Sequence, residues 1–77
     1  MFAYTQADRA IPREQRDRIR ERVRRLARRK GYSLRQELTG WHVRAREADL
    51  PELRVQGLLE AEEFLARQAE WIAPPWR

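Results

Sequence analysis

The fold of this chain is decided by the stretch PREQRDRIRERVRRLARRKG, residues 12–31. Pro12 suits the start of a helix, because its fixed φ is helical and its missing N–H is not needed there. No residue from there to Lys30 breaks a helix, and Gly31 supplies the left-handed residue that often follows a helix end. The stretch therefore predicts one helix over residues 12–30.

This predicted helix carries most of the positive charge of the 77-residue chain. Residues 13–30 hold ten basic and three acidic side chains, whereas the net charge of the whole chain is only +5. The apolar residues Ile19, Val23 and Leu26 follow i, i+4, i+7 spacing and form a narrow seam. A second stripe, roughly 100° away around the helix, consists of Arg18, Arg22, Arg25 and Arg29. A positive field concentrated on one helix indicates a polyanionic partner.

Residues 32–46 allow two interpretations. Thr39-Gly40 is typical of a two-residue turn, and the segments on both sides alternate apolar and polar side chains, which predicts a β-hairpin. Its apolar face is expected to comprise Tyr32, Leu34, Leu38, Trp41, Val43 and Ala45. The alternative is a helix capped by Ser33, which gives a three-helix, helix-turn-helix-like protein. We favour the hairpin, because Gly40 and the β-branched Thr39 are poor helix formers.

The segments after the hairpin complete a small domain. Residues 47–56 contain Pro51 and are expected to form a loop or a third edge strand. Residues 58–72 combine acidic first turns with a wide apolar face, which predicts a C-terminal helix. The sequence thus predicts one α+β domain over residues 1–77, in the order helix, β-hairpin, possible third strand, helix.

The two ends of the chain are less informative. Residues 1–11 are ambiguous, because they alternate like a strand at first and then resemble the start of a helix. Pro74-Pro75 is expected to end the last helix and to leave a tail of residues 73–77. Within this tail Trp76 is a candidate residue for docking a partner, and the alternative is that it covers the core.

The composition argues against several classes of function. The chain has no cysteine and only one histidine, His42, which argues against disulfides and zinc sites. No Gly-rich phosphate loop and no nucleophile motif is present, so we expect no catalytic residue, no metal, no cofactor and no enzymatic activity. Because neither a signal-peptide pattern nor an 18-residue apolar run is found, we expect a cytoplasmic protein of bacterial or phage type without a membrane partner.

The candidate binding residues lie on the basic helix and on the polar face of the hairpin. With Thr39-Gly40 as the turn, Arg35 lies directly opposite Arg44, and His42 faces Glu37. Two like charges at opposed positions destabilise a sheet unless an anion neutralises them. The residues expected to contact phosphates are Arg18, Arg22, Arg25, Arg28, Arg29, Lys30, Arg35, Arg44 and Arg46.

Two functions fit these observations. The first is a small nucleic-acid-binding accessory or regulatory protein, which docks on the phosphates of duplex DNA or RNA. The second is a protein-interaction module, such as a phage-type inhibitor or a small assembly subunit, whose basic helix binds an acidic protein surface. A homodimer is compatible with both, because a chain this short gains stability from further apolar burial.

Overall fold

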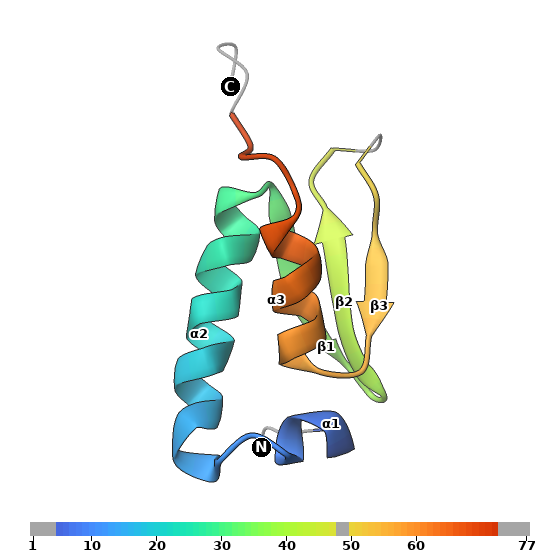
Figure 1. Cartoon of the computed structure of the whole chain (residues 1–77). Coiled ribbons are helices and arrows are strands. Elements are labelled where there is room, and N and C mark those ends of the chain that lie inside the picture. Colours follow the sequence, from blue (N-terminus) through green and yellow to red (C-terminus); the bar gives the residue numbers. More distant parts are fainter. Residues whose placement is uncertain (1–4, 48–49, 73–77) are drawn as a thin grey trace.

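The computed structural model describes residues 5–47 and 50–72. Its elements are α1 (Gln6–Arg9), α2 (Arg13–Arg29), β1 (Tyr32–Glu37), β2 (Gly40–Ala45), β3 (Leu53–Val55) and α3 (Leu58–Ala66). The strands form one antiparallel sheet in the order β1-β2-β3. Figure 1 shows α2 and α3 side by side against this sheet, with α1 at the end where the hairpin turns. The chain is therefore a small α+β domain, and the three-helix alternative is wrong.

The core lies between one face of the sheet and the two long helices. Its buried apolar residues come from the α1–α2 connection, α2, β1, β2 and α3: Ile11, Ile19, Val23, Ala27, Tyr32, Trp41, Val43, Leu58, Ala61 and Leu65. α2 buries only three of these residues. Most of the circumference of α2 is therefore open to solvent, and its arginines lie there except Arg16 and Arg20, which are half-buried.

The end of α2 confirms the predicted glycine signal. Gly31 has a φ of +82°, the left-handed conformation that an L side chain rarely adopts. A Cβ at this position would also lie 2.6 Å from Cγ of Trp71, whose ring packs on the glycine. Gly31 thus ends the helix and makes room for an aromatic ring at the same time.

The hairpin is present, but its turn lies one residue earlier than predicted. Glu37 pairs with Gly40, which leaves Leu38 and Thr39 as the two turn residues. Gly40 is needed inside the strand, because a Cβ there would lie 2.1 Å from the carbonyl oxygen of Val55 in β3. The predicted apolar face keeps its members except Leu38, which lies at the tip of the turn and is 99% exposed.

The third strand is present as β3, whereas α3 is shorter than the predicted helix over residues 58–72. α3 ends at Ala66, after which the chain crosses to the C-terminal end of α2. There the N–H of Trp71 donates to the carbonyl oxygen of Arg29 at 3.0 Å, and Lys30 Nζ donates to the carbonyl oxygen of Gln68 at 2.7 Å. These bonds give partners to the carbonyl group of Arg29 and to the ammonium group of Lys30, at the end of α2.

A buried carboxylate, Asp8, joins three elements of the fold. Its Oδ2 accepts a hydrogen bond from Trp41 Nε1 at 2.6 Å, and its Oδ1 accepts one from the N–H of Leu58 at 2.7 Å. The second bond caps α3, whose own N-cap residue, Gly57, has no side chain for this purpose. Thr5 adds a further link, because its hydroxyl donates to the carbonyl oxygen of Gln56 at 2.6 Å. α1 is thereby held against β2 and the start of α3.

Removing the Asp8 carboxylate should destabilise the whole domain. We expect Asp8→Ala to lower the free energy of unfolding by about 3 kcal/mol, because two buried N–H donors lose a charged acceptor. Urea unfolding measures this change. In a double-mutant cycle with Trp41→Phe, the two substitutions should couple by roughly 1–2 kcal/mol.

Glu21→Ala is the matched control, since this exposed carboxylate on α2 should change stability by less than about 0.5 kcal/mol. An Asp8→Ala variant as stable as this control would show that the buried carboxylate does not hold the elements together.

Candidate nucleic-acid interface

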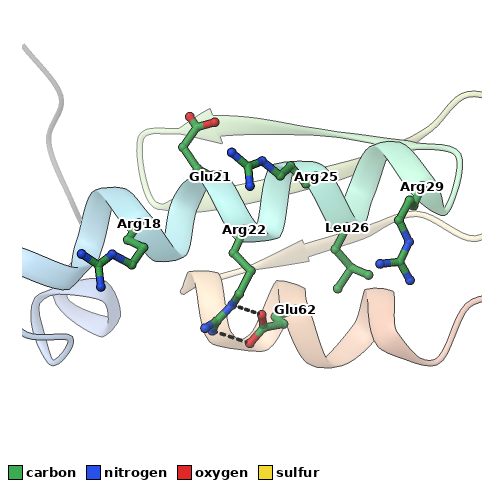
Figure 2. Close-up of a pocket in the computed structure, with 7 residues that line it drawn as sticks. All are labelled: Arg18, Glu21, Arg22, Arg25, Leu26, Arg29 and Glu62. Carbon is green, nitrogen blue, oxygen red and sulfur yellow. Dashed lines mark hydrogen bonds and ion pairs between the residues drawn. The ribbon is translucent and has the colours of Figure 1, made fainter.

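Two grooves flank α2, one on each side. The α2–α3 groove has a volume of about 760 Å³ and is lined by Arg18, Glu21, Arg22, Arg25, Leu26, Arg29 and Glu62 (Figure 2). The α2–β1 cleft has a volume of about 240 Å³ and is lined by Arg24, Arg28, Tyr32, Ser33, Leu34 and Arg46. Six of the nine arginines of α2 are thus divided between two sites of different character.

Acidic residues partly neutralise the α2–α3 side. Arg22 forms a bidentate ion pair with Glu62, in which Nε and Nη2 donate to the carboxylate at 2.6 and 3.0 Å (Figure 2). Arg29 Nη2 donates to Glu70 at 2.8 Å, and Lys30 Nζ lies 3.5 Å from the same carboxylate. Three of the predicted phosphate contacts, Arg22, Arg29 and Lys30, therefore already hold intramolecular partners.

The contact between Arg29 and Glu70 also changes how both groups titrate. The hydrogen bond from Arg29 is the main reason why the pKa of Glu70 lies below its usual value, with a smaller contribution from Lys30. The same hydrogen bond raises the pKa of Arg29. Both side chains remain more than half exposed, so the pair contributes little to stability.

The α2–β1 cleft has the opposite character. Three of its lining residues are arginines, and no carboxylate belongs to the lining among the described residues. Arg24 and Arg28 lie one turn apart on α2 and are exposed, and no ion pair is found for either within residues 5–47 and 50–72. Arg46 lies at the β2 end, where its guanidinium carbon is 5.6 Å from the ring centre of Trp71. This cleft therefore gathers three arginines without a carboxylate among the lining residues that the structure describes.

The predicted sites Arg28 and Arg46 are brought together in this cleft, whereas Arg24 was missing from the prediction. Arg24 lies outside the stripe formed by Arg18, Arg22, Arg25 and Arg29. Its i, i+4 spacing to Arg28 is the signal that identifies it, since residues one turn apart share a helix face.

The open face of the sheet carries the two remaining predicted residues, Arg35 and Arg44. They do not lie opposite each other, because Arg35 pairs with His42 and Arg44 pairs with Ser33. The earlier turn shifts the register by two residues, which keeps the faces but changes the partners. Arg35 and Arg44 are exposed diagonal neighbours, so the predicted head-on repulsion is wrong.

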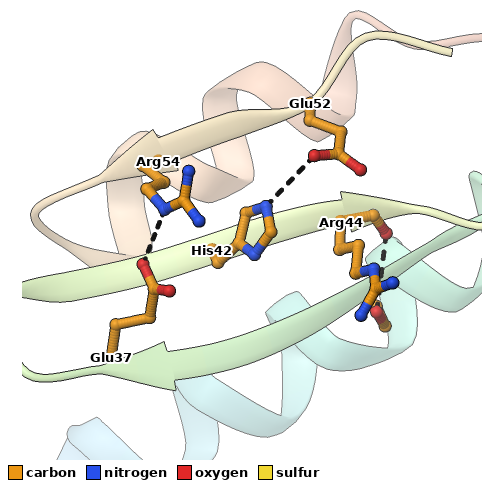
Figure 3. A network of polar contacts seen from close by, with 6 residues as sticks. Glu37, His42, Arg44, Glu52 and Arg54 are labelled. Atoms are coloured by element: carbon orange, nitrogen blue, oxygen red, sulfur yellow. Dashed lines mark hydrogen bonds and ion pairs between the residues drawn. The ribbon is translucent and has the colours of Figure 1, made fainter.

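The polar contacts on this face also differ from the prediction. His42 Nε2 lies 3.3 Å from Glu52, not beside Glu37, and Glu37 instead accepts a hydrogen bond from Arg54 Nε at 3.0 Å (Figure 3). These acids come from β1 and from the residue that precedes β3. The side of the open face next to β3 is therefore largely neutralised.

Other predicted features fall elsewhere. Arg18 and Arg25 line the α2–α3 groove, and Trp76 lies outside the described residues. Within the described part of the chain, no three acidic or histidine side chains are placed to hold a metal ion. None of the helices described here is long and apolar enough to cross a membrane.

Comparison with protein-family models, with curated proteins and with solved structures finds no match to this chain.

The pair formed by Arg29 and Glu70 gives a pH-dependent prediction. The carboxyl carbon of Glu70, followed by NMR, should titrate below its usual pKa in the wild type and close to it in Arg29→Gln. Because the folded-state pKa is lowered, the stabilisation is present above the unfolded-state pKa and is lost as the pH falls through the folded-state value. Lys30→Gln should shift the titration less, and an equal or larger shift would contradict the assigned cause.

Proposed function

We propose that this protein binds nucleic acid by its phosphates, with the α2–β1 cleft as the centre of the interface. The observation that carries the proposal is the meeting of Arg24, Arg28 and Arg46 in one cleft with no carboxylate among its described lining residues. Guanidinium groups are well suited to phosphate, because their planar donors bind two oxygens at once. Ser33 belongs to the same lining, and its hydroxyl donates to the carbonyl oxygen of Arg44 at 3.5 Å.

Neighbouring arginines extend this site in two directions. Arg25 lies next to Arg24 around α2, and Arg44 lies beyond Ser33 on the open sheet face. Both are exposed, and neither has an ion-pair partner among the described residues. The backbone of a duplex can therefore run from the exposed side of α2 across the β1 edge of the sheet.

The chemistry of these contacts defines the kind of binding. Arginine contacts to phosphates position a protein on DNA or RNA but do not read its sequence. Binding of this kind is driven by counterion release, so about four or five contacts give a slope of roughly −4 in a plot of log affinity against log salt concentration for duplex DNA. We propose an accessory or regulatory role in the cytoplasm, without catalysis by the protein itself.

Substitutions on the two sides of α2 test this site. The double variant Arg24→Gln/Arg28→Gln should reduce the magnitude of the salt slope by about 2, because each lost phosphate contact removes about 1. The measurement is fluorescence anisotropy with a labelled duplex at several salt concentrations. Both positions are exposed, so the fold should be unchanged.

Arg22→Gln is the matched control for the single variant Arg24→Gln, which should reduce the magnitude of the slope by about 1. Arg22→Gln removes one arginine from the neutralised side of the same helix, and its salt slope should stay close to that of the wild type. Absence of duplex binding at low salt contradicts the proposed function, and an equal loss in Arg22→Gln and in Arg24→Gln contradicts the location of the site.

A further inference from the structure

The α2–α3 groove has features that phosphate binding does not use. Its floor contains Leu26, a half-buried apolar residue that points toward α3 (Figure 2). Two of its four arginines are held by Glu62 and Glu70. A groove with an apolar floor and a partly neutralised wall suits an amphipathic partner better than a nucleic-acid backbone.

The arginines of this groove follow the heptad spacing of a helix–helix contact. Arg18, Arg22, Arg25 and Arg29 are spaced i, i+4, i+7, i+11, and all four line the groove. With this spacing, the side chains of one helix stay in contact with a neighbouring helix when the two axes cross at about 20°. The stripe is about 16 Å long, which equals three turns.

α3 leaves part of this seam uncovered. α2 has 17 residues and α3 has nine, so α3 spans only about half the length of its neighbour. Leu59 lies three residues before Glu62 on α3, hence on the same side of that helix, and it is 52% exposed. Leu26 offers an apolar contact inside the groove, and Leu59 offers one outside its lining, on the side of α3 that carries Glu62.

We propose that the α2–α3 groove docks an amphipathic helix of a partner protein, with an apolar stripe flanked by carboxylates. The apolar stripe covers Leu26 and Leu59, and the carboxylates pair with Arg18 and Arg25, which lack ion-pair partners among the described residues. Glu62 and Glu70 pair with Arg22 and Arg29, so these side chains form the partly neutralised wall of the groove. Charge complementarity selects an acidic helix over a basic one.

The centre of this site lies on the other side of α2 from the centre of the proposed nucleic-acid site, and only Arg25 borders both. The two proposals can therefore fail independently. Arg24 and Arg25 are neighbours in sequence and both are exposed on α2. Arg24 lines the α2–β1 cleft, whereas Arg25 lines the α2–α3 groove. The same substitution at these two positions changes the total charge equally but affects different sites.

The experiment uses a labelled synthetic peptide of three heptads, with leucine at positions a and d and glutamate at positions e and g. The glutamates prevent the peptide from pairing with itself at neutral pH. Fluorescence anisotropy at physiological ionic strength should show saturable binding to the full chain. A peptide with lysine at positions e and g should not bind.

Arg25→Glu should weaken binding of the acidic peptide at least about tenfold, a change of roughly 1.4 kcal/mol. Arg24→Glu should weaken it less than about twofold, because screening reduces its effect across the helix. For a labelled duplex the order is reversed, and Arg24→Glu is the more damaging change.

Three results overturn the proposal. The first is absence of peptide binding up to about 1 mM, and the second is an equal loss in the two variants, which indicates only general attraction of charge. The third is a wild-type dimer that Arg25→Glu converts to a monomer in sedimentation experiments, because the groove is then occupied by a second copy of the chain.

Discussion

The buried carboxylate of Asp8 is the constraint on which the arrangement of this domain depends. It accepts hydrogen bonds from the Trp41 indole and from the first N–H of α3, at Leu58. A buried carboxylate is stable only when such donors surround it, so the three groups fix one another. The start of α3 is thereby tied to α1 and to the middle strand of the sheet.

This constraint also determines where the charge of α2 is neutralised. With α3 starting at Leu58, Glu62 lies one turn into the helix and meets Arg22, and the segment after α3 brings Glu70 to Arg29. Glu62 and Glu70 are thus placed on one side of α2. The opposite side, facing β1, keeps Arg24 and Arg28 without carboxylate partners among the described residues, and Arg46 joins them there. A helix that is uniformly basic in sequence becomes two surfaces with different binding properties.

Local features of the sequence were sufficient to predict the main elements. Pro12 and Gly31 delimit α2 to within one residue, and the alternation on both sides of residue 39 correctly indicates the hairpin and its faces. The predicted position of the turn was wrong because Gly40 is required by its close packing against the backbone of Val55. In a sequence, a glycine required by packing cannot be told from a glycine required by a turn. The predicted end of α3 was wrong for a similar reason. Trp71 donates a hydrogen bond to the C-terminal end of α2 and does not continue the helix.

The candidate site was only partly predictable. Helical periodicity correctly identified α2 as the basic element, but charge counts could not show which arginines have partners. Glu62 and Glu70 lie about forty positions from Arg22 and Arg29, so no local spacing connects them. Asp8 was missed for the same reason, because its partners Trp41 and Leu58 are distant in sequence and a short polar segment at the start of a chain shows no clear periodicity.

The central claim is that folding divides the arginines of α2 into a free set and a neutralised set. It is tested most directly by NMR of the arginine Nε–Hε groups during titration with a short duplex. The account predicts that the signals of Arg24, Arg28 and Arg46 shift first and furthest, while those of Arg22 and Arg29 stay near their starting positions. Equal shifts of all five signals, or larger shifts at Arg22 and Arg29, would contradict it.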